Sequence, residues 1–551
     1  MKSGELLSLD GDALQLLQEV SEGLQLSKSQ LESGEVEVPQ YRAAYLNELA
    51  GRVSGSVQVN RNAAFRRMIA DLNGYQNSEY DVPTAVHADL RNYQVEGFRW
   101  LCTLAQYGLG GILGDDMGLG KTLQVIAYFV QSKGKALVVC PASLVYNWES
   151  ELRKFAPSLS TAVITGTTER RRELLQDLTF ADVVVTSYDL LKRDVKLYED
   201  LRFDCVVVDE AQYIKNAGTQ AAKAVKTIHS RVRFALTGTP IENRLSDLWS
   251  IFDFIMPGYL YTYPKFRDEM EKPVSLENSD VVTVRLKAMI TPFVLRRKKE
   301  DVLKDLPERL EQAVYVTMTD QQERLYKALE NQLALKLSET SDTDFQQEQI
   351  QILAELTRMR QVCCSPSLCY EGYEGGSGKI DLCIELLQSA AESGHRVLVF
   401  SQFTTMLEQL IAAYGGEHLY LSGKNTKEQR KAMVERFQQG DIPVFFISLK
   451  AGGTGLNLTA ADTVIHVDPW WNVAAQNQAT DRAHRIGQNQ VVTVFKLVTR
   501  DTIEERILEL QERKAQLAEA VLSGEGVADT AITRDALLHI LGNGEAFGSG
   551  C

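Results

Sequence analysis

Residues 111–122 combine the side-chain types needed to bind the phosphates of a nucleotide. They read Gly-Ile-Leu-Gly-Asp-Asp-Met-Gly-Leu-Gly-Lys-Thr. Glycines let main-chain N–H groups approach phosphate oxygens, Lys121 supplies a positive charge, and the Thr122 hydroxyl can ligate Mg²⁺. A helix that begins here would aim its positive end at the same anion. Asp115 departs from the pattern GxxxxGK[ST], which has glycine at that place, so the alternative is a glycine-rich turn that carries Lys and Thr by chance.

Two adjacent acids follow an apolar run farther along the chain. Residues 205–208 are apolar and lead into Asp209 and Glu210. Asp209 would hold Mg²⁺ directly or through water, and Glu210 would orient and deprotonate an attacking water. Acid pairs after apolar strands also arise by chance, but together with the upstream loop they indicate a nucleotide-hydrolysing site. Its candidate metal ligands are Thr122, Asp209 and Glu210.

Short apolar runs alternate with amphipathic segments between about residues 90 and 300. Strands separated by helical segments form a parallel sheet with helices on both faces, so this part is predicted to be an α/β domain. Sites in such sheets lie at the carboxyl ends of the strands. The expected strands are Ala136–Cys140, Val183–Thr186, Cys205–Asp209 and Phe234–Thr237.

A second strand series follows a predicted helical stretch. Amphipathic patterns predict helices at Gln321–Leu337 and Gln347–Val362, and a closing helix at Glu504–Val521. The second strands are Val397–Phe400, Val444–Ser448, Thr463–Val467 and Val492–Leu497. The sequence therefore predicts two similar α/β domains. The expected parts are an N-terminal accessory region (1–85), a first lobe (86–300), a helical linker (301–375), a second lobe (376–530) and a C-terminal tail (531–551).

The composition is that of a globular chain with an acidic balance. Of 551 residues, 44% are hydrophobic and 24% are charged, and the net charge is -14. That charge by itself argues against a nucleic-acid binder, although a local groove can still grip phosphates. No stretch approaches the roughly 18 apolar residues that span a bilayer and no signal-peptide core is present, so we expect a soluble, intracellular protein. The clustered Cys363, Cys364 and Cys369 are interpreted as reduced structural thiols, because a metal site would need further ligands.

Many segments resemble the motifs of Snf2-family (SWI2/SNF2) ATPases of helicase superfamily 2, in the same order along the chain. Residues 116–122 are similar to that family's phosphate-binding motif, which accounts for the missing glycine. Residues 468–472 and 478–488 are nearly diagnostic of it. The other matching segments are 90–97 with Trp100, 141–148, 185–189, 236–243, 295–299, 359–366, 401–403 and 448–457. The resemblance covers about residues 88–510, leaves 1–80 uncovered, and suggests a compact bacterial-type member.

The resemblance implies two RecA-like lobes with one ATP bound between them. Gln94 would read the adenine edge, and Arg482 and Arg485 of the second lobe would act as arginine fingers, which makes hydrolysis depend on lobe closure. Gln212 and Thr237–Thr239 would relay the nucleotide state. The implied catalytic residues are Lys121, Asp209, Glu210, Gln212, Arg482 and Arg485. The implied ATP-binding residues are Arg91, Gln94, Asp116, Met117, Gly118, Leu119, Gly120, Lys121, Thr122, Gly455, Arg482 and Arg485.

The resemblance also implies double-stranded DNA as the track, gripped through its phosphate backbone. The implied DNA contacts are Thr186, Ser187, Ser401, Gln402, Lys450, Gly452, Gly453 and Trp471; for Trp471 the alternative is packing within the protein. We expect a monomeric motor without membrane association, cytoplasmic and nucleoid-associated if bacterial, nuclear if eukaryotic. Its client would be a DNA-bound protein, RNA polymerase in the bacterial case and a nucleosome in the eukaryotic case.

Two other functions are weighed against the duplex translocase. A strand-separating helicase would need a wedge or pin, and no segment is clearly one; the Asp-Glu-Ala-Gln motif at 209–212 favours a translocase. A nucleotide-dependent scaffold without motor activity would be expected to lack an acid or a finger, whereas Lys121, Glu210, Arg482 and Arg485 are all present.

Overall fold

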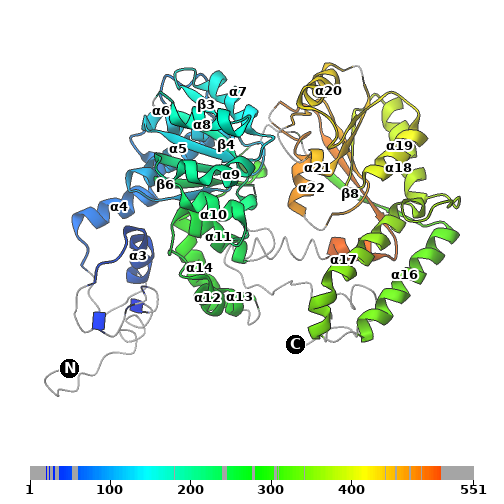
Figure 1. The fold of residues 1–551 in the computed structure, drawn as a ribbon, viewed down its shortest axis with the longest axis horizontal. Coiled ribbons are helices and arrows are strands. Elements are labelled where there is room, and N and C mark those ends of the chain that lie inside the picture. The colour runs from blue at the N-terminus through cyan, green and yellow to red at the C-terminus, as the bar shows by residue number, and fades with distance from the viewer. Residues whose placement is uncertain are drawn as a thin grey trace. The chain divides into compact units, whose positions relative to one another are not determined.

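The computed structural model describes residues 36–51, 60–178, 180–238, 245–275, 279–302, 307, 309–339, 342–440, 442–452, 456–470, 473–485 and 487–509, with a few positions between 20 and 30. These residues form two compact units. The first comprises most of the chain up to Lys298, and the second begins at Lys299 and also includes the short segment Met117–Leu119. Each unit is built on one parallel sheet (Figure 1). Within the described ranges, no helix is long and apolar enough to cross a membrane.

The first unit contains a seven-stranded sheet in the order β3-β4-β2-β5-β6-β1-β7, with every neighbouring pair parallel. Its central strands are buried along their whole length, because helices cover both faces of the sheet. The strands are β1 (Gly111–Leu113), β2 (Ala136–Cys140), β3 (Thr161–Val163), β4 (Val183–Ser187), β5 (Arg202–Asp209), β6 (His229–Leu236) and β7 (Val294–Leu295). Every strand expected in this half is present.

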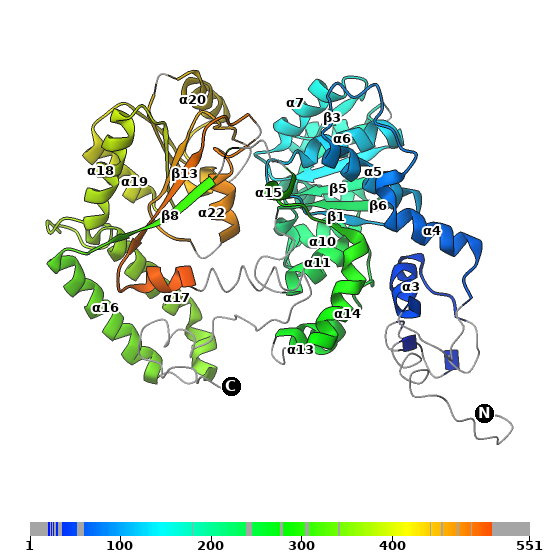
Figure 2. The same ribbon diagram turned by 180° about the vertical axis from the view of Figure 1, so that it is seen from behind.

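Two groups of helices cover the first sheet, seen from opposite sides in Figures 1 and 2. The strand order reverses at β3, so right-handed crossovers place the helices before and after it on opposite faces. One face carries α5 (Asn92–Gln106), α6 (Lys121–Ser132) and α7 (Val145–Phe155), and the other α8 (Thr168–Gln176), α9 (Tyr188–Tyr198) and α10 (Gln220–Thr227). The later helices are α11 (Leu245–Ile255), α12 (Tyr263–Phe266), α13 (Lys272–Ser275) and α14 (Asp280–Ile290).

The N-terminal helices α3 (Ala43–Gly51) and α4 (Ala63–Asn73) belong to the first unit. Arg42 anchors them: its buried guanidinium lies 5.1 Å from the ring centre of Tyr259 and 5.0 Å from that of Tyr261. Its Nη2 donates to the Gly258 oxygen at 3.3 Å. The cation is therefore held by aromatic faces that follow α11, which attaches the accessory region to the first lobe.

The second unit contains a six-stranded parallel sheet in the order β10-β11-β9-β12-β13-β8. Again the central strands are fully buried apolar runs, and every expected strand is present. The strands are β8 (Arg309–Val316), β9 (Val397–Ser401), β10 (His418–Leu421), β11 (Val444–Ser448), β12 (Thr463–His466) and β13 (Val492–Thr499).

Two apolar cores lie on the two faces of this sheet. On one face α18 (Gly378–Glu392) and α19 (Thr404–Tyr414) pack against the strands through Leu387, Met406 and Leu410. The helices of the other face contribute Phe437, Leu449 and Ala479. They are α20 (Lys427–Gln439), α21 (Leu449–Gly452) and α22 (Val473–Thr480). The two-lobed α/β architecture expected from the sequence is therefore confirmed.

The expected helical linker at 301–375 is only partly helical. The short helix α15 (Lys299–Val302) precedes it, and α16 (Asp320–Glu339) and α17 (Asp342–Cys364) pack together with Ile503 and Ile507. Between α15 and α16 in the sequence lies β8, which pairs with β13 along its full length and forms the edge of the second sheet. The prediction was wrong there because β8 is mostly exposed and its first half contains the polar residues Arg309, Glu311 and Gln312. The closing helix is seen for residues 503–509, and its expected continuation to 521 lies outside the described residues.

His466, at the end of β12, makes the stability of the second unit sensitive to pH. Its buried ring stacks on Phe400 at 5.5 Å, and Nε2 lies 2.8 Å from Thr480 Oγ1. Burial lowers the pKa of His466 to about 3 from an ordinary 6.5. Below pH 6.5 this histidine is protonated in the unfolded chain but stays neutral in the folded chain. The free energy of unfolding therefore falls as the pH drops from 6.5 towards 3. At pH 5 the expected loss from this group is about 2 kcal/mol.

Urea unfolding of the protein and of His466→Gln at pH 7 and pH 5 would measure this effect. The glutamine keeps a polar side chain near Thr480 but does not titrate, so its stability should change less between the two pH values. Equal losses in both proteins would contradict the assignment.

Candidate active site

The phosphate loop (residues 114–122) connects β1 to α6, as a strand-to-helix turn should. Lys121 Nζ donates to the main-chain oxygens of Asp115 at 2.6 Å and Asp116 at 3.3 Å, so the loop curves around the ammonium group. Gly120 has φ +74°, and a Cβ placed on it would lie 2.5 Å from Gln94 Nε2. The left-handed backbone angle favours glycine here, and any larger residue would also displace the Gln94 amide.

The two acids lie at the carboxyl end of β5. Glu210 N donates to Asp209 Oδ1 at 2.9 Å, Trp148 Nε1 donates to Asp209 Oδ2 at 2.9 Å, and the Tyr188 hydroxyl donates to the Asp209 main-chain oxygen at 2.8 Å. Burial, and then the charge of Glu210, raise the pKa of Asp209 to about 7; the Trp148 hydrogen bond and the charge of Lys121 act in the opposite direction. The structure thus brings the predicted lysine and both acids into one electrostatic site.

The donors at this site fit a magnesium ion. Burial and repulsion by Glu210 both disfavour a charge on Asp209, and a divalent cation would relieve both. Mg²⁺ in such sites is usually held by one or two carboxylates plus substrate phosphates. Asp209 and Thr122 would hold the ion, which supplies positive charge to the nucleotide phosphates.

A chain of hydrogen bonds leads away from Glu210. Glu210 itself has φ +51°, a left-handed conformation that costs a non-glycine residue free energy. Gln212 Nε2 donates to Glu210 Oε2 at 2.7 Å, and Thr237 Oγ1 donates to Gln212 Oε1 at 3.2 Å. Thr237 N donates to the oxygen of Leu113, at the end of β1, at 3.2 Å. The residues expected to form a relay thereby link the acid to the end of β1, where the phosphate loop begins. Thr239 lies outside the described residues.

Asp115, which breaks the usual loop pattern, is a buried partner of Arg297. Arg297 Nε donates to Asp115 Oδ1 at 2.9 Å and Nη2 to Oδ2 at 2.5 Å. Nη2 also donates to Gln124 Oε1 at 2.9 Å, and Nη1 donates to the Tyr93 main-chain oxygen. Asp115 has no exposed side-chain surface and Arg297 has 10%. The departure from the pattern is therefore a structural device that fixes the first turn of the loop.

Replacing Asp115 by glycine, which restores the usual pattern, is expected to harm the protein. It leaves a buried guanidinium without its carboxylate, and breaking a buried pair in this way costs about 3–5 kcal/mol. Urea unfolding would measure the loss. The control is Asp189→Asn, which removes an exposed pair with Lys192 (2.6 Å) and should cost at most about 1 kcal/mol. A stable Asp115→Gly protein would show that the pair contributes nothing.

The turn at residues 481–485 of the second unit carries the two expected fingers. Arg482 is 1% exposed and Arg485 is half-buried. Arg485 Nε donates to the Asp481 main-chain oxygen at 3.0 Å, which shapes the turn. Gln488 Nε2 donates to the Ala461 oxygen at 2.7 Å and the Ala483 oxygen at 3.1 Å. The characteristic glutamine of this segment therefore ties the turn to the loop before β12.

Comparison with known families agrees with this geometry. Residues 93–368 match the SNF2-related domain, residues 378–487 the helicase conserved C-terminal domain, and residues 1–83 the bacterial SNF2 helicase-associated region. The chain belongs to the SNF2 family. The N-terminal match corrects the expectation that the resemblance leaves residues 1–80 uncovered.

Relatives of this SNF2 protein include the putative ATP-dependent helicase/translocase YwqA of Bacillus subtilis, 38% identical over 85% of this chain and 53% of that one. The ISWI chromatin-remodeling complex ATPase ISW2 of Saccharomyces cerevisiae is 33% identical over 82% of this chain and 43% of that one. A solved Sulfolobus solfataricus SWI2/SNF2 ATPase core in complex with dsDNA is 36% identical, covers 81% of this chain and 96% of that chain, and has a TM-score of 0.42. The chain spans about half the length of the curated relatives it matches. The family confirms the predicted ATP-dependent enzyme.

Several side chains predicted to touch DNA are engaged within the SNF2 lobes. Thr186 and Ser187 are buried at the end of β4, and the Ser187 hydroxyl accepts from Leu190 N to cap α9. Ser401 is buried and donates to Asp468. The expected DNA contacts of these three residues stay predictions, but in this structure all three are almost completely buried, main chain included. The reason is that these residues end central strands of parallel sheets.

The remaining DNA candidates divide into two groups. Gln402 is partly exposed, and its Oε1 accepts from Arg360 Nη1 at 3.3 Å, which joins segment 401–403 to segment 359–366. Gly452 ends α21. Gly453 and Trp471 lie outside the described residues, as do the side chain of Lys450 and the expected ATP-binding residue Gly455. Their expected contacts stay predictions.

Gln94 is buried beside the phosphate loop. The residue is 4% exposed, its Oε1 accepts from Arg91 N at 2.9 Å, and its amide nitrogen lies close to Gly120. In this structure it therefore supports the phosphate loop, and its contact with adenine stays a prediction. Sequence reasoning also missed the roles of Trp148 and Arg297, although both fall in segments that match family motifs.

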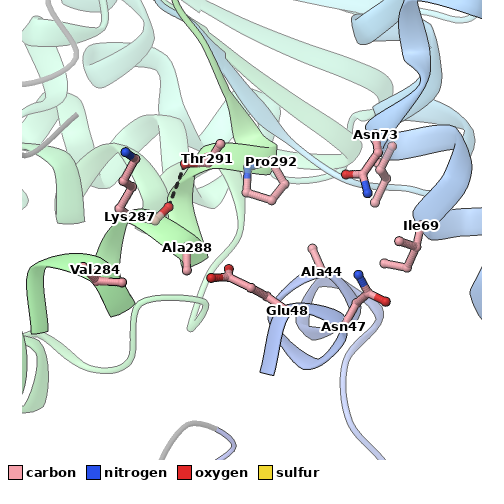
Figure 3. Close-up of a pocket in the computed structure, with 11 residues that line it drawn as sticks. Ala44, Asn47, Glu48, Ile69, Asn73, Val284, Lys287, Ala288, Thr291 and Pro292 are labelled. Atoms are coloured by element: carbon pink, nitrogen blue, oxygen red, sulfur yellow. Dashed lines mark hydrogen bonds between the residues drawn. The ribbon is translucent and has the colours of Figure 1, made fainter. Parts of the chain in front are cut away.

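A cavity of about 380 Å³ lies away from the phosphate loop, where the N-terminal helices face α14 (Figure 3). Glu48 of α3 points toward Ala288 of α14, and the Thr291 hydroxyl donates to the Lys287 oxygen at 2.8 Å. None of the predicted site residues lines it. The lining residues are Ala44, Asn47, Glu48, Ile69, Leu72, Asn73, Val284, Lys287, Ala288, Thr291 and Pro292.

Proposed function

We propose that this protein is an ATP-driven motor that moves along double-stranded DNA and remodels or displaces proteins bound to it. The observation that carries the proposal is the hydrogen-bonded chain Glu210–Gln212–Thr237 beside the phosphate loop. Through these hydrogen bonds, a change at the acid that would activate water would be passed on to the ends of other strands. A motor needs such a route, because hydrolysis must change the protein's conformation.

ATP would bind with its phosphates at the phosphate loop, where Lys121 supplies positive charge and α6 begins. Glu210, which accepts a hydrogen bond from Gln212, would orient and deprotonate the attacking water. Mg²⁺ at Asp209 and Thr122 would complete the charge balance. Arg485, with Arg482, would stabilise the charge that develops on the transferred phosphoryl group. Because the fingers belong to the second unit, turnover would depend on lobe closure.

The names of the relatives support the finer part of the proposal. One relative is called a helicase/translocase and another a chromatin-remodeling complex ATPase, and a solved family core was studied with dsDNA. A DNA-bound protein is therefore the proposed client, with RNA polymerase the candidate for a bacterial protein.

The test is the steady-state ATPase rate with no nucleic acid, duplex DNA, single-stranded DNA or RNA, each across a salt series. Duplex DNA should stimulate most strongly, and the stimulation should fade with salt as phosphate contacts do. Stimulation chiefly by single strands or RNA would favour the helicase instead. A rate that no nucleic acid changes would contradict a nucleic-acid motor.

A further inference from the structure

The segment after β7 runs along the phosphate loop as if the sheet continued. β7 pairs with β1, with Leu295 beside Leu113. Beyond that pair, Gly114 N donates to the Leu295 oxygen at 2.7 Å and Asp116 N to the Arg297 oxygen at 3.0 Å. The Arg297 side chain adds its pair with Asp115. Main chain and side chain of this segment therefore both hold the first half of the loop.

Lys299, two residues later, begins the second unit and donates hydrogen bonds to the turn at residues 481–485, called here the finger turn. Its Nζ donates to Asp481 Oδ1 at 2.6 Å and to the His484 main-chain oxygen at 2.9 Å. Its side chain is 11% exposed and that of Asp481 10%. His484 Nε2 lies 2.9 Å from the oxygen of Pro307, farther along the same connecting segment. The turn that carries Arg482 and Arg485 is thus fastened to the chain just after the boundary between the units.

We propose that Arg297 and Lys299 are positioning residues that couple the phosphate loop directly to the arginine-finger turn. Two residues of extended chain span only about 7 Å, so the connection has no slack. A shift of the loop on binding or hydrolysis of ATP pulls on Lys299 and, through Asp481 and His484, on the turn. This inference rests on the proposed function, since it assigns a route between two parts of the same catalytic machinery.

With this coupling, substitutions at Lys299 and at Arg297 are expected to change different kinetic quantities. Lys299→Met removes the hold on the finger turn and is expected to lower kcat by about 10²-fold, because small misplacements of a catalytic group have effects of that size. Its Kd for a fluorescent ATP analogue should stay within about threefold of wild type, because the phosphate loop is unchanged. Lys299→Arg should recover part of kcat. Arg297→Lys should instead weaken binding of the analogue.

A matched control comes from a second buried lysine pair in the same unit. Lys379 Nζ lies 2.7 and 2.5 Å from the two carboxylate oxygens of Glu504, and both side chains are fully buried. Lys379→Met should destabilise the unit at least as much as Lys299→Met but leave kcat of the folded fraction within about threefold. If both substitutions lower kcat alike, Lys299 acts only on stability and the proposal fails.

The decisive measurement is a double-mutant cycle on kcat. Arg297→Lys and Lys299→Met should be non-additive by about fivefold or more, whereas Arg297→Lys and Lys379→Met should combine within about twofold. Additive behaviour of the first pair in an active protein would overturn the coupling and leave the proposed function intact. A wild-type protein without ATPase activity would refute the proposed function itself. If Lys299→Met does not fold, the cycle is run with Lys299→Arg instead. Additivity of Lys299→Arg with Arg297→Lys would likewise contradict the coupling.

Discussion

Glu210→Gln is expected to lower the rate of ATP turnover by about 10²–10⁴-fold while leaving ATP binding and the fold intact. The amide has the shape of the carboxylate but cannot accept a proton from water. The hydrogen bond from Gln212 can be kept if the new amide turns its oxygen toward Gln212 Nε2. The loss should therefore appear in kcat, measured by phosphate release, and not in Kd for a fluorescent ATP analogue.

Two companion variants sharpen that result. Glu149→Gln alters an acid on α7 that pairs with Arg153 at 2.9 Å on the surface, and it should change kcat less than about twofold. Lys121→Ala removes the charge at the phosphates and should reduce both binding and turnover. Wild-type turnover by Glu210→Gln would remove Glu210 from the mechanism.

Arg485→Ala is expected to lower kcat by about 10³-fold or more, because an arginine finger stabilises charge that exists only in the transition state. KM for ATP should change little. Arg485 is the better test of the two arginines, since Arg482 is buried and its removal would disturb the packing of the second unit as well. Steady-state kinetics with and without duplex DNA would measure both constants.

Arg436→Ala on the exposed side of α20 is the matched control, because it removes the same charge from the same unit. It should leave kcat unchanged. A large loss of ATP affinity with unchanged turnover in Arg485→Ala would mean that this arginine binds the ground state and is not a finger.

The local part of this protein could be read from its sequence. Apolar runs such as 136–140 and 397–400 became buried central strands, because a strand covered on both faces must be apolar throughout. The phosphate loop, the acid pair and the finger segment are contiguous motifs, so their chemistry is carried by neighbours in the chain. Short or exposed strands were missed: β1, β3 and β7 have two or three residues, and β8 is mostly exposed at a sheet edge and begins with a largely polar half.

Pairings between distant residues were decided only by the tertiary structure. Asp115 meets Arg297, and Lys299 meets Asp481, each across 182 positions. Neither pair has a local pattern, because strand order alone brings β7 beside β1 and so places Arg297 next to the loop. For the same reason the sequence could not tell that Thr186 and Ser401 end buried strands while Gln402 stays partly exposed. The residue type determines which interactions a side chain can make, and the packing around it determines whether the side chain is accessible for them.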